Sequence, residues 1–154
     1  MLISSCSSGK SNSQNINQPT NNSQTAENSN STKDDAEGLA MIVKLPFEPE
    51  EAVWREEKAG KSGEGKLTAI LQFKPGDAEK ITAQAQSYKQ PETINFGVES
   101  WFPAEVIAQS QLSGDETLNG ITYAANDFFQ TPYNDGKITR VPESNYFILE
   151  LYSR

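Results

Sequence analysis

The chain of 154 residues contains no histidine and a single cysteine, Cys6. Without histidine it has no Ser-His-Asp or Cys-His catalytic arrangement and no histidine-ligated metal site. With one cysteine it forms no internal disulfide bond, so packing alone must stabilise its folded part. No apolar run approaches the roughly 18 residues of a membrane-spanning helix. From these absences we expect no metal and no cofactor.

Positive charge is scarce as well. Lysine and arginine number 13 against 21 aspartates and glutamates, a formal net charge of −8. The segment through Glu37 carries two lysines and four acidic residues, which leaves −6 for the rest of the chain. Such a surface repels phosphate backbones, and no basic stripe with interleaved aromatic residues is present. We therefore expect no nucleic-acid partner.

Small polar residues make up almost all of the tract from Ser7 to Thr32. Such a tract buries too little apolar surface to offset the entropy lost on ordering. We therefore expect residues 6–37 to form a disordered linker rich in Ser, Asn and Gln. A single domain follows over residues 38–154, long enough to bury a core of its own.

The residues around the only cysteine carry a second signal. The segment Leu2–Ser5 supplies an aliphatic residue and two small residues ahead of Cys6, and this resembles the lipobox of bacterial lipoproteins. The resemblance implies that residues 1–5 are the remnant of a signal peptide, that Cys6 carries a lipid, and that the protein is anchored to a membrane of the cell envelope. By the same analogy, Ser7 favours the outer membrane if the host has two membranes. If Met1 is the true start, the alternative is a cytosolic protein of unknown role.

Apolar patterning and helix breakers predict the elements of the domain. Strands are expected at 39–45, 66–73, 137–141 and 146–152, and helices beginning at Pro75 and Pro103. Residues 50–58 fit either a helix or the first arm of a hairpin, and we favour the hairpin. Residues 120–125 fit either a strand or a short helix. Asn134–Gly136 is typical of a tight turn.

The last strand, 146–152, is the most apolar, so we expect it in the centre of the sheet with both faces buried. Together these elements predict an α+β domain, a small antiparallel sheet with about two helices packed on one face. Gly60–Ser62 resembles the end of a phosphate-binding loop. The preceding glycine and strand that such a loop requires are missing, so we interpret it as a hairpin connection.

Two carboxylates, Glu99 and Glu105, flank Trp101, as in sites that cleave glycans. A carboxylate-dependent hydrolase of cell-wall or surface glycan, using two of Glu99, Glu105, Asp115 and Asp127, is therefore one hypothesis. A plainer interpretation makes Trp101 a core anchor of the helix after Pro103, with Glu105 in its first turn. We favour the plainer interpretation, and we interpret both aspartates as solvated loop residues.

Phe128, Phe129 and Tyr133 precede the predicted turn, and an aromatic patch at a strand end suits partner binding. With Trp101 they form the predicted binding patch. The sequence thus favours a cell-envelope lipoprotein that binds an envelope protein or a glycan and does not act by catalysis.

Overall fold

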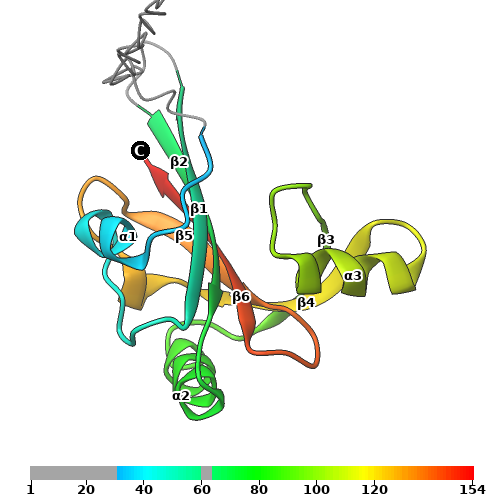
Figure 1. The fold of residues 1–154 in the computed structure, drawn as a ribbon. Coiled ribbons are helices and arrows are strands. Elements are labelled where there is room, and N and C mark those ends of the chain that lie inside the picture. Colours follow the sequence, from blue (N-terminus) through cyan, green and yellow to red (C-terminus); the bar gives the residue numbers. More distant parts are fainter. Residues whose placement is uncertain (1–30, 60–63) are drawn as a thin grey trace, which may run out of the picture.

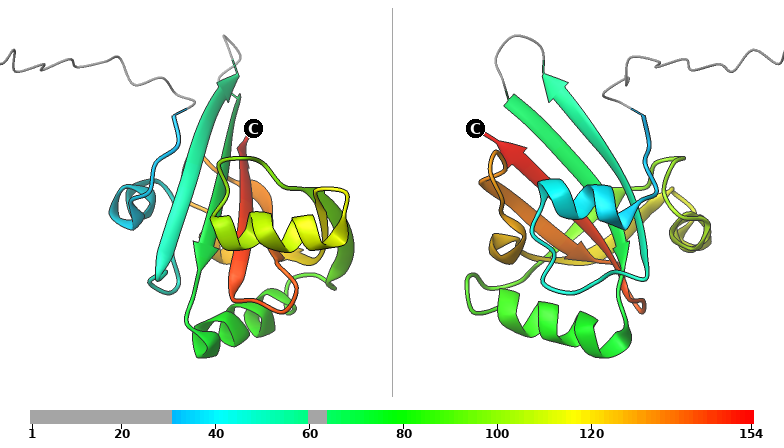
Figure 2. Two further views of the ribbon diagram at one scale, coloured as in Figure 1. Left: turned by 45° about the vertical axis from the view of Figure 1, so that its right-hand side comes forward. Right: turned by 60° about the vertical axis from the view of Figure 1, so that its left-hand side comes forward.

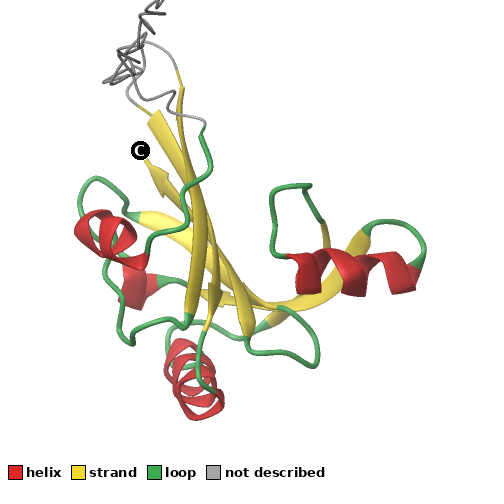
Figure 3. Cartoon of the chain, viewed as in Figure 1, coloured by secondary structure: helices red, strands yellow, loops and turns green. Residues whose placement is uncertain are grey.

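The computed structural model describes residues 31–59 and 64–154. In this part of the chain six antiparallel strands form one twisted sheet in the order β1-β2-β6-β5-β4-β3 (Figures 1 and 3). The strands are β1 (Glu51–Ala59), β2 (Glu64–Gln72), β3 (Glu92–Gly97), β4 (Thr117–Ala124), β5 (Asp135–Arg140) and β6 (Tyr146–Ser153). The α+β class predicted from the sequence is confirmed.

Helices pack on both faces of the sheet. They are α1 (Ala36–Ile42), α2 (Pro75–Ala85), α3 (Ala104–Ser113) and the short 3-10 helix η2 (Asn126–Phe128). Buried residues of α1 and α2 belong to one apolar cluster, and those of α3 to a second. Figure 2 shows α1 and α3 on opposite sides of the β1–β2 hairpin. We call the two sides of the sheet the α1–α2 face and the α3 face.

The α1–α2 face holds the larger core. Side chains alternate between the two faces of a strand, and β6 directs Phe147, Leu149 and Leu151 to this side, where all three are fully buried. The ring of Phe147 meets that of Phe73 edge to face, with centroids 5.8 Å apart. Because β6 lies between β2 and β5, its predicted central position is confirmed.

The α3 face is apolar only where α3 covers it. Ile70 and Ile148 of the sheet pack there with Phe102 and with Val106 of α3. Further along the same face, towards the end of β1 at Ala59 and the start of β2 at Glu64, no helix in the described part of the chain covers the sheet (Figure 1). This face therefore has a covered apolar half and an open half.

The strand predicted at residues 39–45 is wrong, because Leu39–Ile42 belongs to α1 and Val43 is its C-cap. The Asp35 carboxylate accepts a hydrogen bond from Gly38 N at 2.9 Å and so caps the helix. Leu39 and Val43, four residues apart, are buried, whereas Met41 between them is 78% exposed. That burial pattern is helical.

Two further differences from the predicted elements concern strands β3, β4 and β5. Strand β3 was not predicted, and residues 120–125, left open between strand and helix, lie mostly in strand β4. The tight turn predicted at Asn134–Gly136 is also wrong, because Asp135 and Gly136 pair with β6 inside β5. A Cβ atom on Gly136 would collide with the carbonyl oxygen of Glu150, so the glycine permits close approach of two strands.

The predicted hairpin at residues 50–58 is confirmed, since β1 pairs with β2 along its whole length. The helices expected after Pro75 and Pro103 are also present, on opposite faces of the sheet. No helix in the described ranges is long and apolar enough to cross a membrane.

Contacts with the sheet begin earlier than the predicted domain start at residue 38. Lys33 pairs with Trp54 through two backbone hydrogen bonds of 2.8 and 2.9 Å. The Thr32 hydroxyl accepts a hydrogen bond from Arg55 Nε at 2.7 Å. The chain therefore enters the domain along the outer edge of β1. Cys6, most of the linker and Gly60–Ser62 lie outside the described residues.

Candidate functional site

The open half of the α3 face carries polar and charged side chains in two rows across the sheet. In one row Arg55 lies opposite Thr68, Thr68 opposite Glu150, and Glu150 opposite Lys137. In the other, Glu57 lies opposite Lys66, and Lys66 opposite Tyr152. Directly opposite residues share a face of the sheet. We call this set the charged surface: Arg55, Glu57, Lys66, Thr68, Lys137, Glu150 and Tyr152.

Glu150 organises the centre of the charged surface. Its two carboxylate oxygens lie 3.5 Å from Lys66 Nζ and 3.2 Å from Lys137 Nζ. Burial lowers the pKa of Lys66, but the Glu150 carboxylate, together with Tyr152 and Glu57, outweighs burial, and the net pKa is raised. Lys66 therefore stays an ammonium group at neutral pH, and three charges are held in a fixed geometry.

Arg55 connects the charged surface to the loop before α3. Its guanidinium carbon lies 4.8 Å from the centre of the Trp101 ring, and its Nη1 lies 4.0 Å from the Glu99 carboxylate. That carboxylate accepts a hydrogen bond from Trp101 Nε1 at 2.7 Å. The half-buried Trp101 thus stands where the apolar and charged halves of the α3 face meet.

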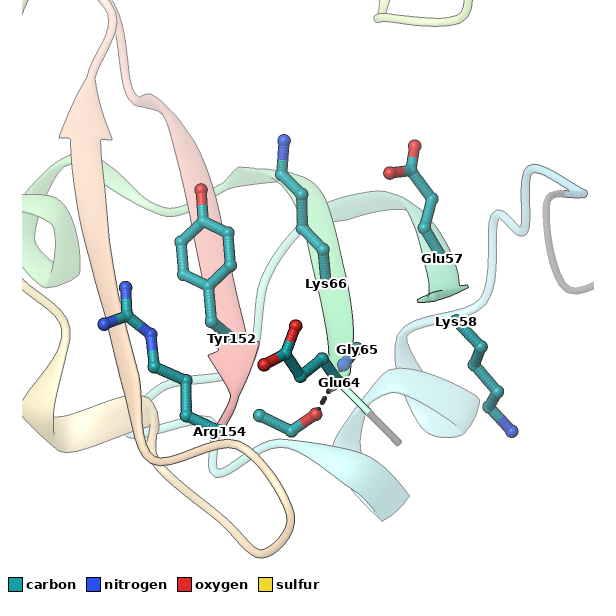
Figure 4. A pocket seen from close by; sticks show the side chains of 8 residues that line it. Glu57, Lys58, Glu64, Gly65, Lys66, Tyr152 and Arg154 are labelled. Carbon is teal, nitrogen blue, oxygen red and sulfur yellow. Dashed lines mark hydrogen bonds between the residues drawn. The ribbon is translucent and has the colours of Figure 1, made fainter. Parts of the chain in front are cut away.

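At the far end of the charged surface lies an open cavity of about 710 Å³ (Figure 4). Glu57, Lys66 and Tyr152 line it from the charged surface, and the remaining lining residues are Lys58, Glu64, Gly65, Ser153 and Arg154. Arg154 also pairs with Asp135 at 3.0 Å. A cavity of this volume lies in the range of small-molecule sites, and its lining is polar and carries both signs of charge.

The predicted binding patch is not one surface. Phe128 and Tyr133 are buried in the core of the α1–α2 face, and Phe129 packs against that core, whereas Trp101 lies on the α3 face. The Tyr133 hydroxyl donates to Glu56 at 2.6 Å, and burial with this bond raises its pKa. Phe128 and Tyr133 are therefore core residues, Phe129 lies at the margin of that core, and Trp101 is the candidate contact on the α3 face.

The four candidate catalytic carboxylates are also dispersed. Asp127 accepts a hydrogen bond from Tyr88 at 2.6 Å and belongs to η2, which packs on the α1–α2 face. Asp115 accepts from Thr117 at 2.9 Å, beyond the end of α3. Of the four, Glu99 is the one whose carboxylate contacts Trp101 in the described structure. No group of three acidic, histidine or cysteine side chains that could hold a metal ion occurs among the described residues.

Glu105 instead belongs to a cluster around Tyr146. The Tyr146 hydroxyl donates to Glu51 at 2.7 Å and lies 3.4 Å from Glu105. Burial, followed by the bond to Glu51, raises the pKa of Tyr146. The phenol therefore stays protonated and acts as a donor that ties β6 to the start of β1.

Sequence reasoning missed Lys66, Lys137 and Glu150 as site residues. The signal was available in β2 and β6, where polar residues occupy every second position over part of each strand. Pairing across the sheet could not be derived from one strand alone. The position of Arg55 beside Trp101 depends on the packing of α3.

Known proteins supply no further guidance, since no family model, no curated protein and no solved structure matches this chain.

Proposed function

We propose that this protein is a lipid-anchored lipoprotein of the cell envelope that binds a partner through the charged surface. The lipobox-like segment Leu2–Cys6 and the polar tract behind it support the anchor. On the expectation that this tract of about 28 residues is disordered, it would span roughly 30 Å as a random coil. That reach suits a domain that binds material standing above the membrane.

The observation that carries the binding role is the fixed charge pattern around Glu150. The Lys66 and Lys137 ammonium groups lie on the two strands that flank β6, and each is within 3.5 Å of the Glu150 carboxylate between them. Sugar hydroxyl groups both donate and accept hydrogen bonds, so such alternation can satisfy several of them at once. Trp101 at the border adds an aromatic ring with a polar edge.

A protein partner fits the charged surface less well. The buried centres of protein interfaces are depleted of Lys and Glu and enriched in aromatic and apolar residues. The charged surface has the opposite composition, because its centre is Lys66, Glu150 and Lys137. We therefore propose an envelope glycan as the partner.

The test is co-sedimentation of the full chain, carrying Cys6→Ser, with peptidoglycan sacculi from the producing bacterium. Lys66→Glu and Lys137→Glu should each weaken binding about tenfold or more, because each removes a charge-assisted hydrogen bond. Lys44→Glu makes the same charge change at an exposed lysine outside the charged surface and should bind as the parent does.

Absence of binding, or an equal loss in all three variants, would contradict the glycan proposal. Binding that disappears when the sacculi are treated with protease would identify an envelope protein as the partner. New reducing ends in the glycan would favour the carboxylate hydrolase.

The anchor has its own test, which does not depend on the partner. Mass spectrometry of the N-terminal peptide from membranes of the producing bacterium should find Cys6 as the first residue with diacylglycerol attached. A peptide that begins at Met1 with a free thiol, recovered from the soluble fraction, would contradict the anchor.

A further inference from the structure

The two edge strands of the sheet, β1 and β3, differ in how well they are protected from pairing with another strand. The β1 edge is partly covered by Lys33, which pairs with Trp54, and it ends in the charged residues Glu56–Lys58. The β3 edge has β4 as its one neighbour in the described chain. From Thr93 to Val98 this strand and its extension contain no charged residue and no proline. Exposed, uncharged edges of this kind invite pairing with another strand.

The hydrogen-bonding direction of β3 can be read from its last contact. Val98 N donates to Glu116 O at 3.1 Å, so the backbone groups of Val98 point to the β4 side. Residues in an antiparallel strand alternate in this respect. The N–H and C=O groups of Thr93, Asn95 and Gly97 therefore point outward, away from β4.

These three residues are evenly spaced about Asn95. If two copies of β3 pair antiparallel with Asn95 on the two-fold axis, Asn95 faces its equivalent and Thr93 faces Gly97 of the second copy. Every outward-pointing backbone group of Thr93, Asn95 and Gly97 then has a partner. If the axis passes through Ile94 or Phe96 instead, one of the three residues is left facing a residue outside β3 of the second copy.

Side chains on β3 suit the same register. Ile94 and Phe96 are half-buried on the α3 face, and the axis would place Ile94 of one copy opposite Phe96 of the other. Phe96 already packs against the apolar cluster of that face, so the cluster would continue across the axis. The one charge of the strand, Glu92, is paired with Lys89 at 2.8 Å. A Cβ on Gly97 would have no atom within 4 Å, so the facing threonine has room.

We propose that the protein forms a homodimer through antiparallel pairing of β3 with β3 of a second copy, centred on Asn95, to give a continuous sheet of both copies. A two-fold axis perpendicular to the sheet keeps both charged surfaces on one side. Two linked sites facing the same way raise the apparent affinity for a repeating ligand through effective concentration.

The test is the mass of the full chain in solution, measured by sedimentation equilibrium over a dilution series in a Cys6→Ser background. The parent should have twice the mass of one chain at the higher concentrations. Asn95→Lys should reduce it to the mass of one chain, because it places two ammonium groups face to face. Ala83→Lys, on the exposed side of α2, should leave the dimer intact.

Cross-linking tests the register independently of dimer strength. In the same background, Asn95→Cys should be joined into a covalent dimer by a short bismaleimide, because directly opposite Cα atoms in such a pair lie about 5.5 Å apart. Ala83→Cys should not be joined. A parent that stays a single chain at every concentration, or equal cross-linking of both cysteines, would overturn the proposal. Neither result depends on glycan binding or on the lipid.

Discussion

Successive residues of strand β6 lie in two different environments. Leu149 is fully buried on the α1–α2 face, whereas Glu150 lies between two lysines on the open half of the α3 face. The first face is closed by two helices and is filled with apolar side chains. The second is closed only where α3 lies. The difference indicates that stability resides mainly on one side of the sheet and that the charged surface on the other side is available for binding.

The largest loss of stability should come from removing a buried side chain on the α1–α2 face. Leu149→Ala should lower the free energy of unfolding by about 2–5 kcal/mol, because it leaves a cavity among fully buried side chains. Urea titration followed by circular dichroism measures this. A loss below 1 kcal/mol would show that this face is not the main core.

The next largest loss of stability should come from adding a side chain where the α3 face is already tightly packed. A Cβ on Gly120 would lie 2.6 Å from Thr139 Cγ2 and 2.8 Å from Phe96 Cε1. Gly120→Ala should therefore cost about 1–3 kcal/mol of stability. Gly76→Ala is the matched control, since nothing lies within 4 Å and its position in α2 favours alanine. The control should be neutral or stabilising in the same urea titration.

The charged surface should contribute little to stability. Glu150→Gln should change the free energy of unfolding by less than about 1 kcal/mol, because partly exposed ion pairs contribute weakly. The same variant should lose glycan binding in the co-sedimentation assay. A large loss of stability would instead assign Glu150 to the core and weaken the comparison between the faces.

The smallest effect on stability should come from alkaline pH, which acts through the ionisation of Tyr146. The pKa of Tyr146 is raised by burial and by the bond to Glu51, whereas a tyrosine in the unfolded chain ionises near pH 10. The unfolded chain therefore loses this proton first, and the stabilisation present below pH 10 is lost as the pH rises above it. Tyr146→Phe should lose less stability than the parent between about pH 8 and pH 11. Equal losses would show that Tyr146 does not titrate with unfolding.

The sequence predicted the elements whose pattern is local. Strand β6 is apolar at nearly every position, and α2 follows Pro75 with Ala78, Ile81 and Ala85 at helical spacing. Residues 39–45 show the limit of this reasoning, because a short apolar run does not distinguish a strand from a helix. The cap at Asp35 was the available signal for α1. Strand β3 was missed because only Ile94 and Phe96 alternate in it.

The candidate site was less predictable than the fold. Trp101 was selected for its neighbours in sequence, Glu99 and Glu105, yet its contact across the sheet is Arg55. That contact joins β1 to a loop more than 40 residues away in sequence, and no local pattern reports it. The aromatic residues near position 130 suggested a surface, but Phe128 and Tyr133 are buried in the core and Phe129 packs against it.

The most direct test of the binding role is a map of the contact surface by nuclear magnetic resonance. Soluble peptidoglycan fragments would be titrated into the isotope-labelled full chain carrying Cys6→Ser, and amide shifts would be followed residue by residue. We predict that the largest shifts occur at Arg55, Lys66, Lys137, Glu150 and Tyr152. Shifts confined to α1, α2 and the loops of the opposite face, or none at all, would contradict it.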